Sequence, residues 1–346
     1  MNNIIFNDIL NVQRPRRPRQ YRHRPSQLLD TFTDTEIRDR YRFDRDNIRW
    51  ICDWLRDDLQ RPTNRNHALS VEIQVLVSLR FLASGSFIQV TSDVFGIDKS
   101  TYSRVVRDFV TAVVNKRNDF IYFPRDADEK DEIKKAFFNL GGFPSTIGCV
   151  DGVHVPVKNP PSDDEASYVN RKGWHSINVQ GIADANYVFR NVVAKWPGSS
   201  HDSFIFRTSN IYEYFEENLR LLDDGLILGD SGYALSRYLM TPYSDPVTPA
   251  QKRFNNAHKS TRGTVERAFG QLKRRFPCLS LGLRLRPNKW CKVIVACFVL
   301  HNIAKSLYDP DFEDVDGYIC EEMPEGNNNN NHAGIMVREH ITRTFF

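Results

Sequence analysis

A nearly continuous run of β-branched and other apolar residues at 147–157 constrains the fold of this chain more than any other segment. A strand with one face in water alternates apolar and polar residues, whereas such a run is typical of a strand buried on both faces of a sheet. One acidic residue, Asp151, interrupts the run. A lone buried carboxylate costs on the order of several kcal/mol unless it is paired, hydrogen-bonded or bound to a metal. The segment therefore predicts a buried strand with a partnered acidic side chain.

Composition and periodicity divide the chain into four parts. Residues 1–27 are polar, rich in arginine and contain proline, which is typical of a disordered basic arm. Residues 28–140 have the apolar spacing of helices. Residues 141–306 alternate between strand-like and helix-like segments and predict an α/β domain with a mixed sheet. Residues 307–346 form an acidic, asparagine-rich tail that is expected to be disordered.

Within the α/β domain, β-branched runs and helical apolar spacing place the individual elements. Strands are expected at 147–157, 175–183, 187–196 and 226–229, and helices at 203–217, 264–276 and 290–306.

The composition is that of a globular protein with an ordinary core. The 346 residues are 40% hydrophobic and 26% charged, with a formal net charge of +4 and a pI near 8.7. No apolar run reaches the roughly 20 residues that span a bilayer, and the N-terminal residues do not resemble a secretory signal. The six cysteines lack zinc-site spacing, and several lie in apolar runs. We expect buried free thiols in a reducing compartment.

Positive charge is concentrated in the N-terminal arm, which contains Arg14, Arg16, Arg17, Arg19, Arg22 and Arg24. A cluster of this kind is typical of a nuclear-import signal or of a tail that binds phosphates. A solvated leader without such a role is the alternative.

A helix-turn-helix pattern occurs at 87–106. A short helix at 87–95 is followed by a turn around Gly96 and by a second helix that begins near residue 99. That second helix would present side chains suited to phosphates and base edges, namely Lys99, Ser100, Ser103, Arg104 and Arg107. The pattern therefore predicts DNA contact by this helix, with an ordinary helical hairpin as the alternative.

Two further aspartates lie where ligands bind in α/β proteins. Asp230 ends the strand expected at 226–229, and such strand ends are ligand sites in open α/β sheets. An aspartate before a glycine often simply caps a turn, but two acidic residues on neighbouring strands favour a shared site with Asp151. Asp202 is either a metal ligand or the N-cap of the helix expected at 203–217.

The helix expected at 264–276 adds Glu266 to this set. At about 100° per residue, Arg262, Glu266 and Lys273 fall within about 40° of one another, beside an apolar stripe that can pack on the sheet. Glu266 would then complete a metal site with Asp151 and Asp230, while Arg262 and Lys273 would hold substrate phosphates. The alternative is a solvated Arg–Glu pair on an exposed face.

Six segments together resemble the PIF/Harbinger transposases, and among them the Harbinger transposase-derived nuclease of animals. They read CVDGVHV at 149–155, YVNRKG at 168–173, WPGS at 196–199, GDSGY at 229–233, LMTP at 239–242 and VERAFG at 265–270. The resemblance covers about residues 40–305 in the same order, which makes the set specific although no single segment would be.

The resemblance implies an RNase H-like catalytic domain of the DDE type, a divalent metal, DNA as substrate and a location in the nucleus, with the cytoplasm as a second compartment. By this resemblance Asp151 matches the first-strand aspartate and Glu266 the helical glutamate of an Arg-x-x-x-Glu-x-x-x-x-x-x-Lys signature. Either Asp230 or Asp202 matches the second aspartate. Lys259 stands where related bacterial transposases have a tyrosine. Domesticated members are thought to act with a Myb-like partner protein.

Two hypotheses of different classes result. The first is a metal-dependent DNA endonuclease, in which Mg²⁺ or Mn²⁺ ions held by Asp151, Asp230 and Glu266, with help from Asp202, drive phosphodiester cleavage by a two-metal mechanism. The second is a catalytically silent, domesticated DNA-binding or adaptor protein. In that case the helix-turn-helix and the basic arm would act through salt-sensitive phosphate contacts.

Overall fold

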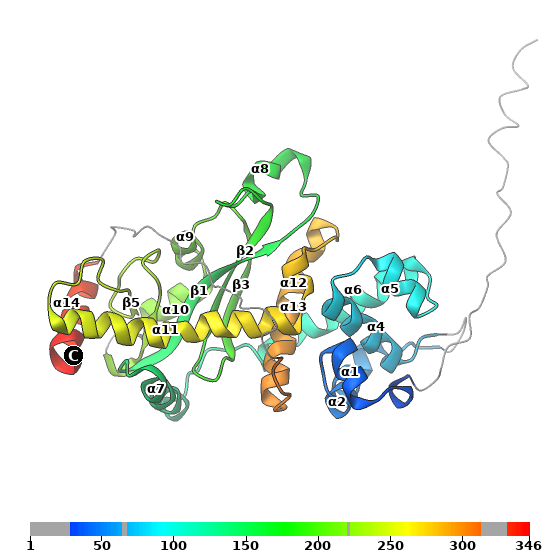
Figure 1. The fold of residues 1–346 in the computed structure, drawn as a ribbon, viewed down its shortest axis with the longest axis horizontal. Helices are drawn as coiled ribbons and strands as arrows, with labels where there is room; N and C mark the ends of the chain where they lie inside the picture. The colour runs from blue at the N-terminus through cyan, green and yellow to red at the C-terminus, as the bar shows by residue number, and fades with distance from the viewer. Residues whose placement is uncertain (1–27, 64–67, 220–221, 313–330) are drawn as a thin grey trace, which may run out of the picture.

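The computed structural model describes residues 28–63, 68–219, 222–312 and 331–346. The basic arm at 1–27 lies outside these ranges, so its disorder and its role stay predictions. The described chain is elongated, with a helical region adjoining a sheet that helices cover (Figure 1).

The helical region contains α1 (Asp34–Tyr41), α2 (Arg45–Trp54), α3 (Arg56–Leu59), α4 (Val71–Ser84), α5 (Ile88–Val94) and α6 (Lys99–Asn115). The strands are β1 (Thr146–Pro156), β2 (Ser176–Ala183), β3 (Phe189–Pro197), β4 (Leu226–Leu228) and β5 (Leu239–Met240). The remaining helices are α7 (Ala127–Gly141), α8 (Glu165–Tyr168), α9 (Asp202–Arg207), α10 (Asn210–Asn218), α11 (Pro249–Arg275), α12 (Cys278–Leu281), α13 (Pro287–Ser306) and α14 (His332–Phe345).

The five strands form one mixed sheet in the order β3-β2-β1-β4-β5. β2 pairs antiparallel with β1 and β3, whereas β4 pairs parallel with β1 and β5. β1 therefore lies at the centre of the sheet, and the prediction of a mixed α/β domain is confirmed. β5 was not predicted, since two residues are too few to form a recognisable apolar pattern.

Helices cover both faces of this sheet. Side chains alternate between the faces along a strand, so Asp151 and its neighbour Gly152 face opposite ways. α11 covers the face of Asp151 and packs Phe269 against Gly181 of β2. α9 approaches the other face, where Asp202 lies against Gly152. α7, which the sequence grouped with the helical region, packs against β1 and α11.

α11 is much longer than the helix expected at 264–276. It begins at Pro249, and a capping box joins the N-cap residue Thr248 to Gln251 at the third helical position. The first half of α11 is mostly polar, and Phe254 and His258 are its buried anchors. The helix expected at 203–217 is instead two helices, α9 and α10, because the backbone leaves helical geometry at Ser209.

The helix-turn-helix segment contains the elements that the sequence predicted. α5 and α6 are joined by a turn at Gly96, whose φ of 58° suits glycine. Asp98 caps α6 by accepting the backbone N–H of Ser100. DNA contact by α6 stays a prediction.

The expectation of a disordered tail was wrong for residues 331–346. α14 packs on β5 and α11, with Ile341 fully buried and Tyr243 Oη 2.9 Å from Thr342 Oγ1. The guanidinium of Arg338 lies 4.2 Å from the centre of the Tyr243 ring. The acidic, asparagine-rich stretch dominated the composition and hid the apolar residues of this last helix.

A buried ion pair joins the helical region to the rest of the molecule. Arg275, at the end of α11, lies 2.7 Å from Asp309, and their side chains are 1% and 0% exposed. Asp309 also accepts the backbone N–H of Asp44 at 2.9 Å and pairs with Arg38 at 3.2 Å. Removing one partner of such a buried pair costs about 3–5 kcal/mol. We infer that the two parts are held rigidly together.

Five cysteines lie in the described ranges, and all are free thiols as predicted: Cys52, Cys149, Cys278, Cys291 and Cys297. Among the described helices, none is long and apolar enough to cross a bilayer.

Candidate active site

Asp151 lies on the central strand, near the edge of the sheet where β4 ends. Its side chain is 18% exposed, and the backbone N–H of Gly152 donates to its Oδ1 at 2.9 Å. Burial raises the pKa of Asp151 to about 7, against the opposing effect of Arg262, and the carboxylates of Asp230 and Asp202 raise it further. This carboxylate is therefore held in a site that favours a nearby cation.

Asp230 is brought beside Asp151 by the register of the two parallel strands. Cys149 pairs with Leu228, so the residues two positions further along each strand are neighbours at the same edge. The backbone N–H of Gly232 donates to Asp230 Oδ1 at 2.9 Å and orients the carboxylate. Burial raises the pKa of Asp230, although Arg262 opposes that shift.

Arg262 supplies the positive charge at this edge. From α11 it reaches Asp151, with Nη1 3.2 Å from Oδ2, and it also pairs with Glu266 one helical turn away. Burial would lower the pKa of Arg262, but Asp151, Glu266 and Asp230 outweigh that effect and raise it. Arg262 thus bridges two predicted metal ligands, and its predicted role in phosphate binding requires that it release them.

Asp202 enters from the opposite face of the sheet. It is 7% exposed, and Asn178 of β2 donates its Nδ2 hydrogen to Asp202 Oδ1 at 2.8 Å. Burial raises its pKa, and Asp230 adds to that shift. His201 is the N-cap residue of α9 and makes no side-chain cap, so N-capping is not the role of Asp202. Of the two alternatives left by the sequence, metal ligation is the one that stays open.

Lys273 lies further along α11 than the carboxylates. Its Nζ donates to the backbone carbonyl of His154 on β1 at 3.4 Å. Arg262 and Lys273 are eleven positions apart, which corresponds to about 16 Å along a helix. The two cations therefore lie on the same face of α11, as predicted, about three helical turns apart.

The predicted DNA-contacting residues of α6 are not at the acidic edge. Lys99, Ser100, Arg104 and Arg107 are exposed on α6, which packs on α13, and Ser103 is half-buried. The hydroxyl of Ser100 is held by Asp98 at 2.6 Å, so it serves the cap.

The sequence did not single out Asn178 or Gly152, the two residues that place Asp202. Asn178 is 2% exposed within a strand whose residues are all buried. A polar side chain in such a strand is a signal comparable to the one that marked Asp151.

The donor set suits a hard divalent cation. Carboxylate oxygens are the ligands that Mg²⁺ and Mn²⁺ prefer. Asp151, Asp202 and Asp230 are desolvated, Asp230 raises the pKa of both other aspartates, and Asp202 raises that of Asp151, so a cation among them would relieve that repulsion. Within the described ranges no three such residues stand at metal-ligating geometry, and Arg262 pairs with Asp151 and Glu266.

Comparison with known proteins identifies the family of this arrangement. A family model described as DDE superfamily endonuclease matches residues 150–302, which include all four candidate carboxylates. The human protein named "Putative nuclease HARBI1" is 40% identical over 279 residues, or 80% of this chain and 79% of that protein. The chain belongs to the Harbinger-derived DDE endonuclease family.

Relatives of this family occur in other organisms. The Xenopus laevis protein of the same name is 36% identical over 279 residues, covering 80% of both chains. "Protein ALP1-like" of Arabidopsis thaliana is 29% identical over 295 residues, 79% of this chain and 71% of that protein. No solved structure matches this chain.

Proposed function

We propose that this chain is a divalent-metal-dependent DNA endonuclease with an RNase H-like catalytic domain. The observation that carries the proposal is the convergence of Asp151, Asp230 and Glu266 around the single guanidinium of Arg262. The mixed sheet, with its central strand antiparallel to β2 and parallel to β4, supports the RNase H-like assignment. The DDE endonuclease match over residues 150–302 supports the reaction class.

Asp151, Asp230 and Glu266 would hold the metal, and Asp202 would assist from the other face of the sheet. Mg²⁺ or Mn²⁺ held there would activate a water or a 3′-hydroxyl for phosphodiester cleavage and would offset the charge on the leaving oxygen, as in a two-metal mechanism. No covalent enzyme intermediate is needed.

The side chains of the protein prepare this site. Backbone N–H groups of Gly152 and Gly232 fix the orientation of Asp151 and Asp230, and Asn178 fixes Asp202. Arg262 balances the negative charge in the metal-free protein. To bind a substrate phosphate, the guanidinium of Arg262 would have to exchange these carboxylates for phosphate oxygens.

The proposal extends to substrate, location and partner. DNA would be the substrate, contacted by Lys99, Ser100, Ser103, Arg104 and Arg107 of α6 and by Lys273. The arm at 1–27 would direct the protein to the nucleus, and a Myb-like protein would help to select the site. If a reporter fused to residues 1–27 stays in the cytoplasm, the import role is excluded.

Cleavage of supercoiled plasmid tests the central proposal. Wild type should nick the plasmid in Mg²⁺ or Mn²⁺ and not in EDTA. Asp151→Ala and Glu266→Ala should abolish nicking while retaining DNA, whereas Glu132→Ala, at an exposed position on α7, should behave as wild type. Nicking by Asp151→Ala in Mg²⁺ would overturn the assignment.

One observation favours the alternative of a silent DNA-binding or adaptor protein. Arg262 already pairs with Asp151 and Glu266, so part of the negative charge at the acidic edge is balanced without metal. The two functions differ in one measurement. Salt-sensitive DNA binding without nicking in any divalent metal would favour the adaptor.

A further inference from the structure

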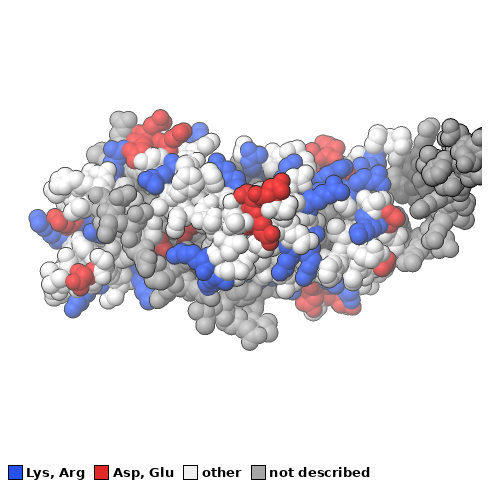
Figure 2. All heavy atoms as spheres, turned by 90° about the horizontal axis from the view of Figure 1, so that it is seen from above, with Lys and Arg blue, Asp and Glu red and all other residues white. Residues whose placement is uncertain are grey.

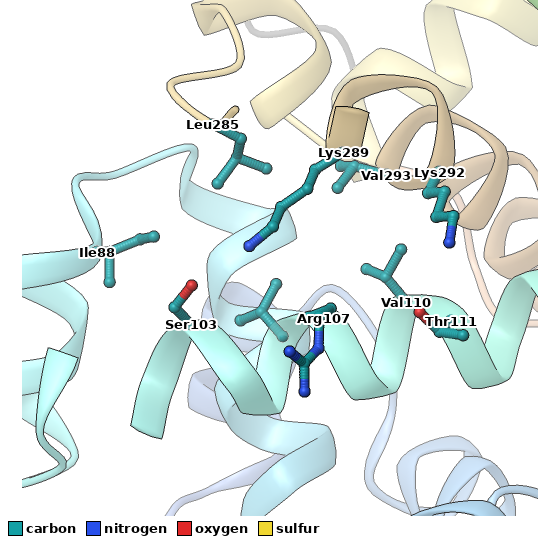
Figure 3. A pocket seen from close by; sticks show the side chains of 10 residues that line it. Ile88, Ser103, Arg107, Val110, Thr111, Leu285, Lys289, Lys292 and Val293 are labelled. Carbon is teal, nitrogen blue, oxygen red and sulfur yellow. The ribbon is translucent and has the colours of Figure 1, made fainter. Parts of the chain in front are cut away.

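The junction between α6 and α13 contains a small cavity with a basic rim. Its volume is about 30 Å³, and its rim carries Ser103 and Arg107 of α6 together with Lys289 and Lys292 of α13. Figure 3 shows the side chains of Lys289 and Lys292 extending from α13 toward α6, whereas the guanidinium of Arg107 lies against α6. The cations of the rim thus come from α6 in the helical region and from α13, which packs on the sheet.

The interior of this cavity is apolar. Val106 and Val110 of α6 face Leu285 and Val293 across it. Lysine stems lie readily over such a surface while the ammonium group stays at the rim. The charged groups therefore lie at the rim of the cavity, and its interior is apolar.

Within the part of the chain that the structure describes, an acidic partner offsets only one of these rim charges, that of Arg107. Within the described ranges, neither Lys289 nor Lys292 forms an ion pair, and the only carboxylate paired with Arg107 is Asp108 on its own helix. The pKa of Lys289 is lowered by burial and by the nearby charges of Arg107 and Arg286. Cations crowded in this way are stabilised by an anion that bridges them.

Two of the predicted DNA-contacting residues of α6, Ser103 and Arg107, line this cavity. At about 100° per residue, Lys99, Ser103 and Arg107 lie within about 80° of one another, while Asp108 lies on the far side from Lys99. Figure 2 shows Lys and Arg gathered over the end of the molecule that carries the helical region. The positive surface therefore continues from α6 onto α13.

We propose that this α6–α13 cavity, whose rim carries Ser103, Arg107, Lys289 and Lys292, binds the phosphate backbone of duplex DNA. The inference rests on the proposed function, which makes DNA the substrate, and it adds residues of α13 that the sequence did not single out. Because backbone contacts are independent of sequence, the cavity rim would hold DNA in position and leave base reading to other groups.

The test is the salt dependence of DNA binding by the full chain, measured in EDTA with a fluorescent duplex of random sequence. Removing both lysines in Lys289→Gln/Lys292→Gln should weaken binding and lower the slope of log K against log salt by about one unit per lysine. The matched control is Lys135→Gln/Lys252→Gln, which makes the same charge change at exposed positions on α7 and α11. The control should keep the wild-type slope.

Plasmid nicking in parallel separates this inference from the proposed function. An unchanged slope in Lys289→Gln/Lys292→Gln overturns DNA binding at the cavity rim, even if wild type nicks DNA. A slope that falls equally in the control also overturns it, because net charge would then explain the effect. A fall confined to the α13 variant supports DNA binding at the cavity rim, even if no variant nicks. If the double variant unfolds, Lys292→Gln alone, at an exposed position, should lower the slope by about one unit.

Discussion

The carboxylate of Asp202 occupies the space where a side chain at Gly152 would begin. A β-carbon added to Gly152 would stand 2.4 Å from Asp202 Oδ1 and 2.8 Å from its Cγ. Since Asp151 faces the other way from the same strand, the two carboxylates approach β1 from opposite sides. Glycine at position 152 is therefore what allows an acidic residue of α9 to reach this edge of the sheet.

We expect Gly152→Ala to displace Asp202 and to lower the free energy of unfolding by about 1–3 kcal/mol, the usual cost of overpacking. Metal-dependent nicking should fall with it. Gly270→Ala is the matched control, because its added carbon would meet the flexible end of Arg274 at 3.4 Å. Helix propensity should make that change neutral or stabilising by up to about 1 kcal/mol. Denaturant titration of both variants measures the difference, and equal stability would contradict the close packing.

Arg262→Met should leave Asp151 and Glu266 without their shared counter-charge. The protein should lose about 3–5 kcal/mol of unfolding free energy in EDTA, as when one partner of a buried pair is removed. Divalent cations should then raise the melting temperature more in this variant than in wild type.

The control for that experiment is Arg267→Met, which removes a neighbouring arginine of α11 whose guanidinium lies 5.8 Å from the centre of the Tyr187 ring. Thermal melts with Mg²⁺, Mn²⁺ or EDTA provide the comparison. An equal metal-induced shift in Arg262→Met and in wild type would count against metal binding among the carboxylates.

The raised pKa of Asp151 has a consequence for stability against pH. Its folded pKa is about 7 and its ordinary value is 3.8, so the native state holds the extra proton between these values. The contribution of Asp151 to the free energy of unfolding therefore declines as pH rises from about 4 to about 7. We expect the stability of Asp151→Asn relative to wild type to rise over that interval in EDTA and to level off above it. Urea titrations across the interval measure this difference; a constant value would refute the shift.

Ile341→Ala should test whether α14 belongs to the folded core. The side chain of Ile341 is fully buried, and truncation of such a residue costs about 2–5 kcal/mol. Met336, on the same helix, is 57% exposed, so Met336→Ala should change stability by less than about 0.5 kcal/mol. Equal effects in chemical denaturation would show that α14 does not pack as described.

The strands with strong local patterns were predictable from sequence. β1 was expected at 147–157 and spans Thr146–Pro156, because a central strand has apolar residues on both faces. β5 could not be predicted, since its two residues are defined by pairing with β4. The first half of α11 was missed although Thr248 and Gln251 formed a capping box, because few apolar residues follow them.

The candidate site was predictable only as a set of residue types. An acidic residue in an apolar strand marked Asp151, and helical spacing placed Arg262 beside Glu266. The contact between Arg262 and Asp151 joins residues 111 positions apart, so it depends on how α11 crosses the sheet. Sequence alone could not show that the guanidinium of Arg262 would lie between the carboxylates.

The hydrogen bonds and ion pairs around Asp309 fix the position of the helical region relative to the sheet. Because Arg275, Arg38 and the backbone of Asp44 meet at this one carboxylate, the helical end cannot swing independently of the sheet. A DNA duplex bound near α6 would then reach the acidic edge at a constant distance from α6. In such a nuclease the cleavage site would lie a fixed number of base pairs from the α6 contact. Removing the contacts of Asp309 would make that number variable.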